Sequence, residues 1–188
     1  MLARGDLELA RRDRALPGLA LLLDSDAFTA AAQTAFAQRA LDVVVGSARA
    51  TYVRYKPGTS CLVAYRIELD GVESDLYARA YRTTAYDKLG KVRELIARHP
   101  SLAQGGLLLD HVAVAAFFFP NDRRLPVLAR LTDEPARRRL WERLLPERPA
   151  LWNASLRRLR YKPERRYVAT LIADGTEQAL LKLYTAQD

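Results

Sequence analysis

The residues best suited to chemistry in this sequence are basic ones near its end. Lys182 lies in "ALLKLY", where strand alternation places its side chain on one face and the flanking leucines on the other. Earlier, the turn "KPERR" carries Lys162, Arg165 and Arg166. Ammonium and guanidinium groups at such positions can bind phosphate oxygens. Two simpler interpretations stay open: an edge-strand lysine whose ammonium group reaches water, and a charged turn in solvent.

These basic residues belong to a segment that occurs twice in the chain. "RYKP" at 54–57 returns at 160–163, and a later Asp-Gly turn also returns, so the offset falls from 106 to 104 residues. Beyond the turns, "YARAY" aligns with "LLKLY", which places Arg79 opposite Lys182. A shared block, a shared turn and a similar strand predict an internal duplication.

The elements that must position these residues predict an α+β chain. Alanine-rich helices come first, and segments rich in β-branched and aromatic residues then predict three antiparallel strands. A helix over about 85–98 carries an apolar stripe of Leu89, Val92 and Ile96, and two short buried strands complete a β-β-β-α-β-β unit. The predicted parts are an N-terminal helical segment (1–47), this antiparallel sheet unit (48–122), a helical connector (123–153) and a second, partial three-stranded antiparallel unit (154–188).

Composition excludes several classes of site and partner. Cys61 is the only cysteine and the two histidines are not clustered, so neither an internal disulfide nor a zinc ligand set is expected. The apolar run at 18–23 is too short to span a bilayer, and we expect a cytoplasmic protein without a membrane partner. The net charge of +8 favours polyanions, but no nucleic-acid recognition motif accompanies it, so nucleic acid is not an expected partner.

Four segments carry a resemblance to a known family. "RYKPGTSCLVAY", "FPNDRRLPVLARL", "RYKPERRYVA" and "ALLKLY" resemble the N-terminal half of bacterial phosphotransferases of the aminoglycoside phosphotransferase family, which have the protein-kinase-like fold. The resemblance covers residues 48–188 and implies an N-lobe with a five-stranded antiparallel sheet and one helix after the third strand. Residues 48–122 then resemble a degenerate N-lobe, and 154–188 resemble the start of an ATP-binding N-lobe that is truncated after its third strand.

The resemblance also implies which residues bind a nucleotide. Lys182 matches the third-strand lysine that pairs with ATP phosphates, and Lys162, Arg165 and Arg166 lie in the turn that covers them. ATP and magnesium are the cofactors expected for a full-length enzyme. In the first copy Arg79 replaces the lysine, and the following helix offers no inward carboxylate, because its acidic residues Asp87 and Glu94 fall opposite its apolar stripe.

No catalytic residue is expected in this chain. In the family the loop aspartate lies two positions after a histidine. Here the residues two positions after His99 and His111 are Ser101 and Ala113. We place His99 at a helix C-terminus and His111 at a strand start, and we give Asp110 and Asp122 turn or strand-end roles.

The chain is therefore expected to be inactive alone. We read it as the nucleotide-binding part of an ATP-dependent small-molecule phosphotransferase with a hydroxyl or sugar-like acceptor. It would be a truncated product, a fragment or part of a split enzyme, whose C-lobe is missing or lies on a partner chain. The alternative is a non-catalytic regulatory or partner-binding module, and a nucleic-acid binder rests on net charge alone.

Overall fold

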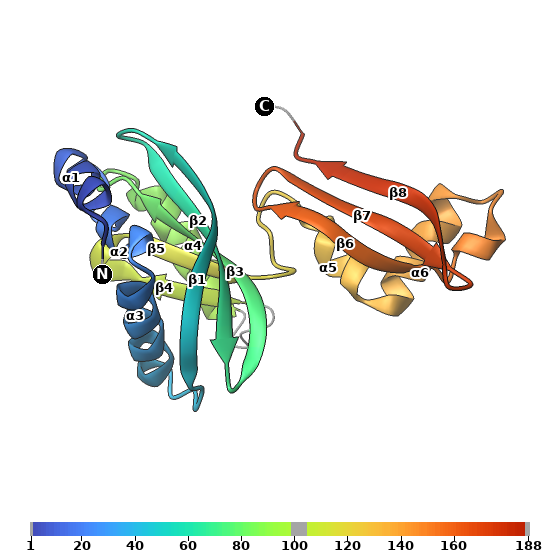
Figure 1. Cartoon of the computed structure of the whole chain (residues 1–188), viewed down its shortest axis with the longest axis horizontal. Helices are drawn as coiled ribbons and strands as arrows, with labels where there is room; N and C mark the ends of the chain where they lie inside the picture. Colours follow the sequence, from blue (N-terminus) through green and yellow to red (C-terminus); the bar gives the residue numbers. More distant parts are fainter. Residues whose placement is uncertain (1, 99–104, 187–188) are drawn as a thin grey trace. The chain divides into compact units, whose positions relative to one another are not determined.

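The computed structural model describes residues 2–98 and 105–186, which fall into two compact units (Figure 1). Residues 1–119 form the first unit and residues 120–188 form the second. The predicted α+β class is confirmed, because the first unit contains a five-stranded antiparallel sheet and the second a separate three-stranded antiparallel sheet.

The first unit begins with helices and continues with the predicted sheet. Its strands have the order β1-β2-β3-β5-β4, and every neighbouring pair is antiparallel. The Asp70-Gly71 pair forms the β2–β3 turn with φ angles of +51° and +78°, as the Asp-Gly signal predicts. The elements are α1 (Arg4–Arg12), α2 (Leu19–Leu23), α3 (Ser25–Gln38), β1 (Val45–Lys56), β2 (Ser60–Leu69), β3 (Val72–Tyr81), α4 (Tyr86–Arg98), β4 (Gly106–Leu109), a 3-10 turn η1 (Asp110–Val112) and β5 (Val114–Phe118).

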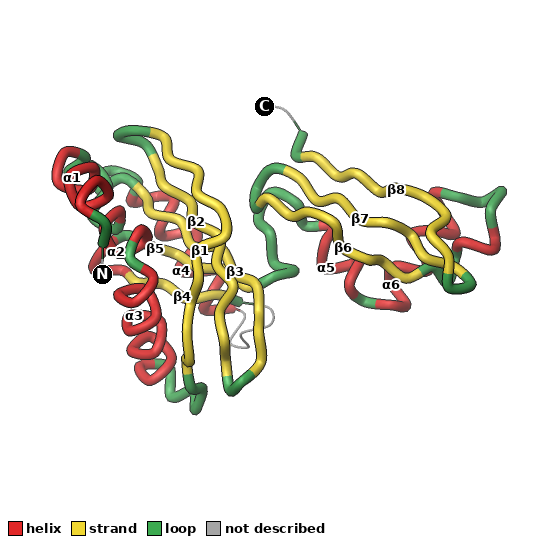
Figure 2. Tube along the Cα trace, in the orientation of Figure 1, coloured by secondary structure: helices red, strands yellow, loops and turns green. Residues whose placement is uncertain are grey.

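Helices cover both faces of this five-stranded sheet (Figures 1 and 2). One face packs with α2 and α3, and Phe28 stacks on Tyr65 at a centroid distance of 4.2 Å. The other face packs against α4, whose predicted stripe of Leu89, Val92 and Ile96 is buried. Both faces of the central strands are therefore withdrawn from water.

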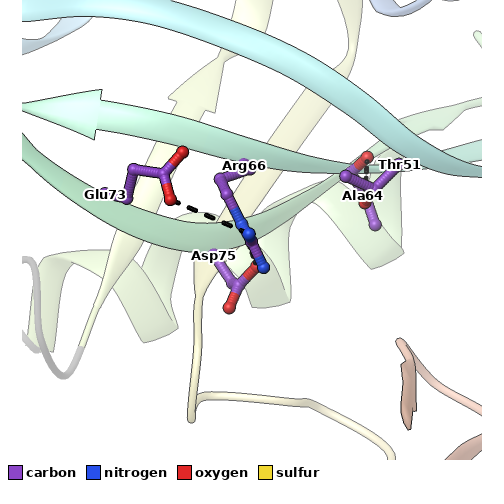
Figure 3. A network of polar contacts seen from close by, with 5 residues as sticks. All are labelled: Thr51, Ala64, Arg66, Glu73 and Asp75. Carbon is purple, nitrogen blue, oxygen red and sulfur yellow. Dashed lines mark hydrogen bonds and ion pairs between the residues drawn. The ribbon is translucent and has the colours of Figure 1, made fainter. Parts of the chain in front are cut away.

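Polar contacts between strands accompany the apolar core (Figure 3). Arg66 on β2 lies 3.7 Å from carboxylate oxygens of both Glu73 and Asp75 on β3. The Thr51 hydroxyl donates to the Ala64 carbonyl oxygen at 3.2 Å, beside an irregularity in the β1–β2 register. Cross-strand pairs of this kind favour one register over its neighbours.

The second unit is a helical layer followed by three strands. Its elements are α5 (Val127–Thr132), α6 (Glu134–Leu144), a 3-10 turn η2 (Pro149–Leu151), β6 (Ser155–Lys162), β7 (Arg166–Ala173) and β8 (Thr176–Tyr184). On one face of the sheet Tyr167, Ala169 and Leu171 are buried, and the helices contribute further buried residues such as Leu128 and Trp141. The sequence predicts a helical connector over residues 123–153, but in the structure these residues form one layer of the second unit. Their apolar side chains and the strands bury one another.

The strand registers of the two units agree at the aligned positions. Arg79 pairs with Leu62 on β2, and Lys182 pairs with Val168 on β7. Leu62 and Val168 are themselves separated by the offset of 106 residues that "RYKP" shows. Arg79 and Lys182 therefore occupy equivalent positions on equivalent third strands.

The repeat also includes the helices, which the sequence analysis missed. The pattern D-R-x-L-P-x-L-A-x-L-x-D occurs at 13–24 and again at 122–133. Its first aspartates precede α2 and α5, and its last ones, Asp24 and Asp133, accept backbone hydrogen bonds as the N-caps of α3 and α6. The three leucines of each copy are buried: Leu16, Leu19 and Leu22 in the first, Leu125, Leu128 and Leu131 in the second.

Candidate functional site

A basic hollow lies in the second unit, where β6 turns into β7. Lys162, Arg165 and Arg166 line it together with Tyr184 and Thr185 from the end of β8, and its volume is about 550 Å³. No acidic residue is among these lining residues. The structure thus brings three of the four predicted phosphate-binding residues to one place.

Strand pairing and one loop hydrogen bond assemble this hollow. Lys162 pairs with Arg166, and Arg166 pairs with Tyr184, so the three side chains lie in one row across the sheet. The Thr185 N–H donates to the Arg165 carbonyl oxygen at 3.1 Å, which ties the turn to the end of β8.

Lys182 lies on the same face but does not line the hollow. It is two residues from Tyr184 along β8, a separation of about 7 Å in a strand. Its side chain is exposed, as are those of Leu180 and Tyr184 on the same face. The prediction that these three residues share one face agrees with the burial pattern of β8.

A buried carboxylate outside the hollow holds its turn. Asp122 is 3% exposed, and its Oδ2 accepts from the Glu164 N–H at 2.7 Å and from the Tyr161 hydroxyl at 2.9 Å. Its Oδ1 accepts from the Arg124 and Leu125 N–H groups at 2.8 and 3.0 Å. Asp122 does occupy a turn, as predicted, but the sequence analysis missed its link to the basic turn.

The first unit contains the same arrangement around Asp13. Asp13 Oδ2 accepts from the Tyr55 hydroxyl at 2.7 Å and from the Gly58 N–H at 2.8 Å. Partial burial raises the pKa of Asp13, but hydrogen bonds from Gly58, Tyr55 and the Ala15 N–H outweigh it and hold the pKa below its usual value. The signal for both aspartates was the D-R-x-L-P pattern ahead of each "RYKP".

The turn of the first unit lacks the basic character of the second. Thr59 and Ser60 stand where the second unit has Arg165 and Arg166. The Arg79 guanidinium lies over the Tyr81 ring, 5.4 Å from its centroid, and its Nη2 is 3.5 Å from Ser60 Oγ. The nearby side chains thus engage this arginine within the protein.

The acidic residues of α4 point away from the sheet, as predicted. Asp87 and Glu94 are both exposed, and Glu94 pairs with Arg98 on the helix surface at 3.8 Å. The inward face of α4 carries apolar side chains. It therefore offers Arg79 no carboxylate from Asp87 or Glu94.

The remaining candidates do not form a catalytic group. His111 lies in η1 and not at a strand start, because the chain makes a 3-10 turn before β5 begins. Asp110, in the same turn, forms an exposed ion pair with Arg93. His99 and Ser101 lie outside the described residues. Within residues 2–98 and 105–186, no three His, Cys, Asp or Glu side chains are grouped to hold a metal ion.

Neither the described helices nor comparisons with known proteins assign a further function to this chain. None of these helices combines the length and the apolar character needed to cross a membrane. Comparisons with protein-family models, with curated proteins and with solved structures found no match to this chain.

Proposed function

We propose that the second unit binds the phosphates of ATP, as the nucleotide-binding part of a small-molecule phosphotransferase with a hydroxyl or sugar-like acceptor. The observation that carries this proposal is the meeting of Lys162, Arg165 and Arg166 at one hollow that no acidic side chain lines among the described residues. Clustered cations attract a polyphosphate, and guanidinium groups bind two of its oxygens at once.

The guanidinium of Arg166 supports the proposal further. Its Nε is buried and has no hydrogen-bond partner among the described residues. A buried donor without a partner is costly, and an oxygen of a bound ligand would satisfy it.

Lys182 supplies a further positive charge to the proposed site. It lies about 7 Å from Tyr184 along β8, so its flexible side chain would meet a phosphate group that extends from the hollow over the sheet. No three His, Cys, Asp or Glu side chains are grouped among the described residues, so we assign no magnesium ligand. We assign this part of the chain a binding role and no catalytic residue.

Isothermal titration of the whole chain with ATP tests this proposal. Arg166→Gln keeps a polar side chain and removes the charge and the Nε donor, so we expect ATP binding at least about tenfold weaker. Lys162→Ala should also weaken binding, whereas Lys56→Ala, at the equivalent position of the first unit, should leave it unchanged. Equal losses from Lys56→Ala and Lys162→Ala would mean that general charge, and not this hollow, attracts ATP.

The open sheet face of the second unit favours a second candidate, a partner-binding module. Leu159, Leu180 and Tyr184 are each more than half exposed on this sheet. The face that bears Leu180 and Tyr184 corresponds to the face that α4 covers in the first unit. An apolar helix face from another chain would fit there. Concentration-dependent association that Leu180→Asp abolishes, without any response to ATP, would favour this candidate over the first.

A further inference from the structure

We infer that Asp122 is a positioning residue for the proposed phosphate site. It lies ahead of α5, outside the hollow, and its carboxylate holds the backbone that carries Arg165 and Arg166. This inference rests on the proposed function for its ligand, but the geometry of the carboxylate stands independently of it.

One carboxylate joins two parts of the second unit. Asp122 Oδ1 accepts from two backbone N–H groups that lead into α5, and Oδ2 accepts from Glu164 and Tyr161. We call the two Oδ2 contacts the Asp122 clamp. The carboxylate is almost fully buried, so water does not compete strongly for these contacts.

The Asp122 clamp holds a backbone conformation that Glu164 does not favour. Glu164 has a φ of +55°, in the left-handed region that a residue with a Cβ atom adopts at a cost. Its N–H donates to Asp122 Oδ2 at 2.7 Å, and Arg165 and Arg166 follow Glu164 directly in the chain. The direction in which these arginines leave the turn therefore depends on a conformation that Asp122 stabilises.

The first unit shows what the same contact does without a basic turn. Gly58 is equivalent to Glu164, has a φ of +59° and donates to Asp13 at 2.8 Å. Glycine adopts this conformation without a steric cost, so the turn of the first unit depends less on its carboxylate. Only the second unit combines a strained turn residue with two following arginines.

Asp122→Asn breaks either the Asp122 clamp or the Oδ1 contacts at the start of α5, with almost no change in shape. A carboxylate accepts at both oxygens, whereas an amide has one accepting end and one donating end. Whichever way round the asparagine sits, its NH2 group faces donor groups, either at Glu164 or at the start of α5. Asp13→Asn makes the same change in the first unit and is the matched control.

Binding of ATP and of inorganic tripolyphosphate to the whole chain tests the inference. We expect Asp122→Asn to weaken both by about tenfold or more, and Asp13→Asn to leave both within about twofold of wild type. Removing a negative charge beside three cations would by itself strengthen anion binding. A merely electrostatic effect therefore has the opposite sign to loss of positioning.

Amide hydrogen exchange without ligand supplies an independent measurement. The Glu164 N–H should exchange faster in Asp122→Asn, and the Gly58 N–H should not. Tyr161→Phe removes one of the two clamp contacts and keeps the ring, whether or not Asp122→Asn folds. We expect the same effects on binding and on exchange in this variant, but smaller ones.

Two outcomes separate the inference from the proposed function. If wild type binds ATP, and both Asp122→Asn and Tyr161→Phe bind it equally well or more tightly, the positioning role is wrong. If wild type binds neither ATP nor tripolyphosphate, the proposed function fails. Exchange at Glu164 then decides by itself whether Asp122 holds the turn, and an unchanged rate in both Asp122→Asn and Tyr161→Phe overturns that role.

Discussion

At the scale of single residues, two aspartates that look like ordinary turn residues organise the structure. Asp13 and Asp122 each accept a tyrosine hydroxyl and the N–H of a residue with positive φ. Both carboxylates thereby hold a hairpin turn that lies far away in the sequence. Because each is the shared acceptor of several donors, replacing it leaves more than one polar group without its partner.

We predict that Asp13 makes the free energy of unfolding of the first unit depend on pH in the acid range. Its pKa is below the usual value in the folded chain, so its contribution is present above an unfolded pKa of about 3.9 and is lost as the pH falls through the folded value. Asp13→Asn should lower the free energy of unfolding near neutral pH by about 1 kcal/mol, since the site is only partly buried and solvent screens the charge. The mutant should also lose this part of the acid dependence.

Urea unfolding between pH 3 and pH 7, followed through the reactivity of Cys61 toward a disulfide reagent active in acid, measures this difference. Asp42→Asn, at an exposed aspartate in the same unit, is the control for removal of a carboxylate. The interpretation of Asp13 would be wrong if its mutant kept the full acid dependence of wild type.

At the scale of elements, the repeated unit is a pair of helices followed by three strands. The two copies differ where α2 and α5 begin. A Cβ atom on Gly18 would lie 2.2 Å from Val114 Cγ2 and 2.7 Å from the Val112 carbonyl oxygen, so the residues before and within β5 require glycine at that position. The equivalent residue of the second unit is Val127. The helix pair has thus adapted to different neighbours in each copy.

We predict that exchanging these two residues has unequal effects. Gly18→Val should destabilise the first unit by about 3 kcal/mol, because a side chain must enter an occupied space beside backbone. Val127→Gly should cost the second unit only about 1 kcal/mol, the usual loss for glycine in a helix. Thermal unfolding followed by circular dichroism measures both, and equal effects would contradict the close approach of α2 to β5.

At the scale of the whole molecule, the chain has two units that each bury their own apolar residues. The sequence supplies a separate probe for each unit. Cys61 is the only cysteine and lies fully buried in the first unit, where burial and the charge of Asp13 raise its thiol pKa to about 11. The only two tryptophans, Trp141 and Trp152, both lie in the second unit.

We predict that these probes report two separable unfolding transitions. Gly18→Val should lower the urea midpoint for Cys61 labelling and leave the midpoint for tryptophan emission nearly unchanged. Asp122→Asn should lower the midpoint for tryptophan emission and leave the midpoint for Cys61 labelling nearly unchanged. Each substitution affects the core of one unit only. Thiol labelling and tryptophan fluorescence on the same samples measure both. Coincident shifts of both midpoints in either mutant would show that the units unfold as one.

Features that depend on neighbouring residues were predictable from the sequence by itself. The Asp70-Gly71 turn, the buried stripe of α4 and the alternation around Lys182 each follow from local conformation or periodicity. The equivalence of Arg79 and Lys182 also followed, because the aligned strands keep their side-chain alternation. The sequence therefore determined the α+β class and the presence of two related sheets.

Only the tertiary structure decided which distant groups meet. Asp122 contacts residues about forty positions away, and Arg165 shares a hollow with Thr185, which follows the end of β8. Neither contact produces a periodic pattern in the sequence, because contacts between distant residues depend on how whole elements pack. For the same reason residues 123–153 looked like a connector, although packing makes them one layer of the second unit. The sequence determined where the positive charges lie along the chain, and the fold decided which of them share a site and which carboxylate holds their turn.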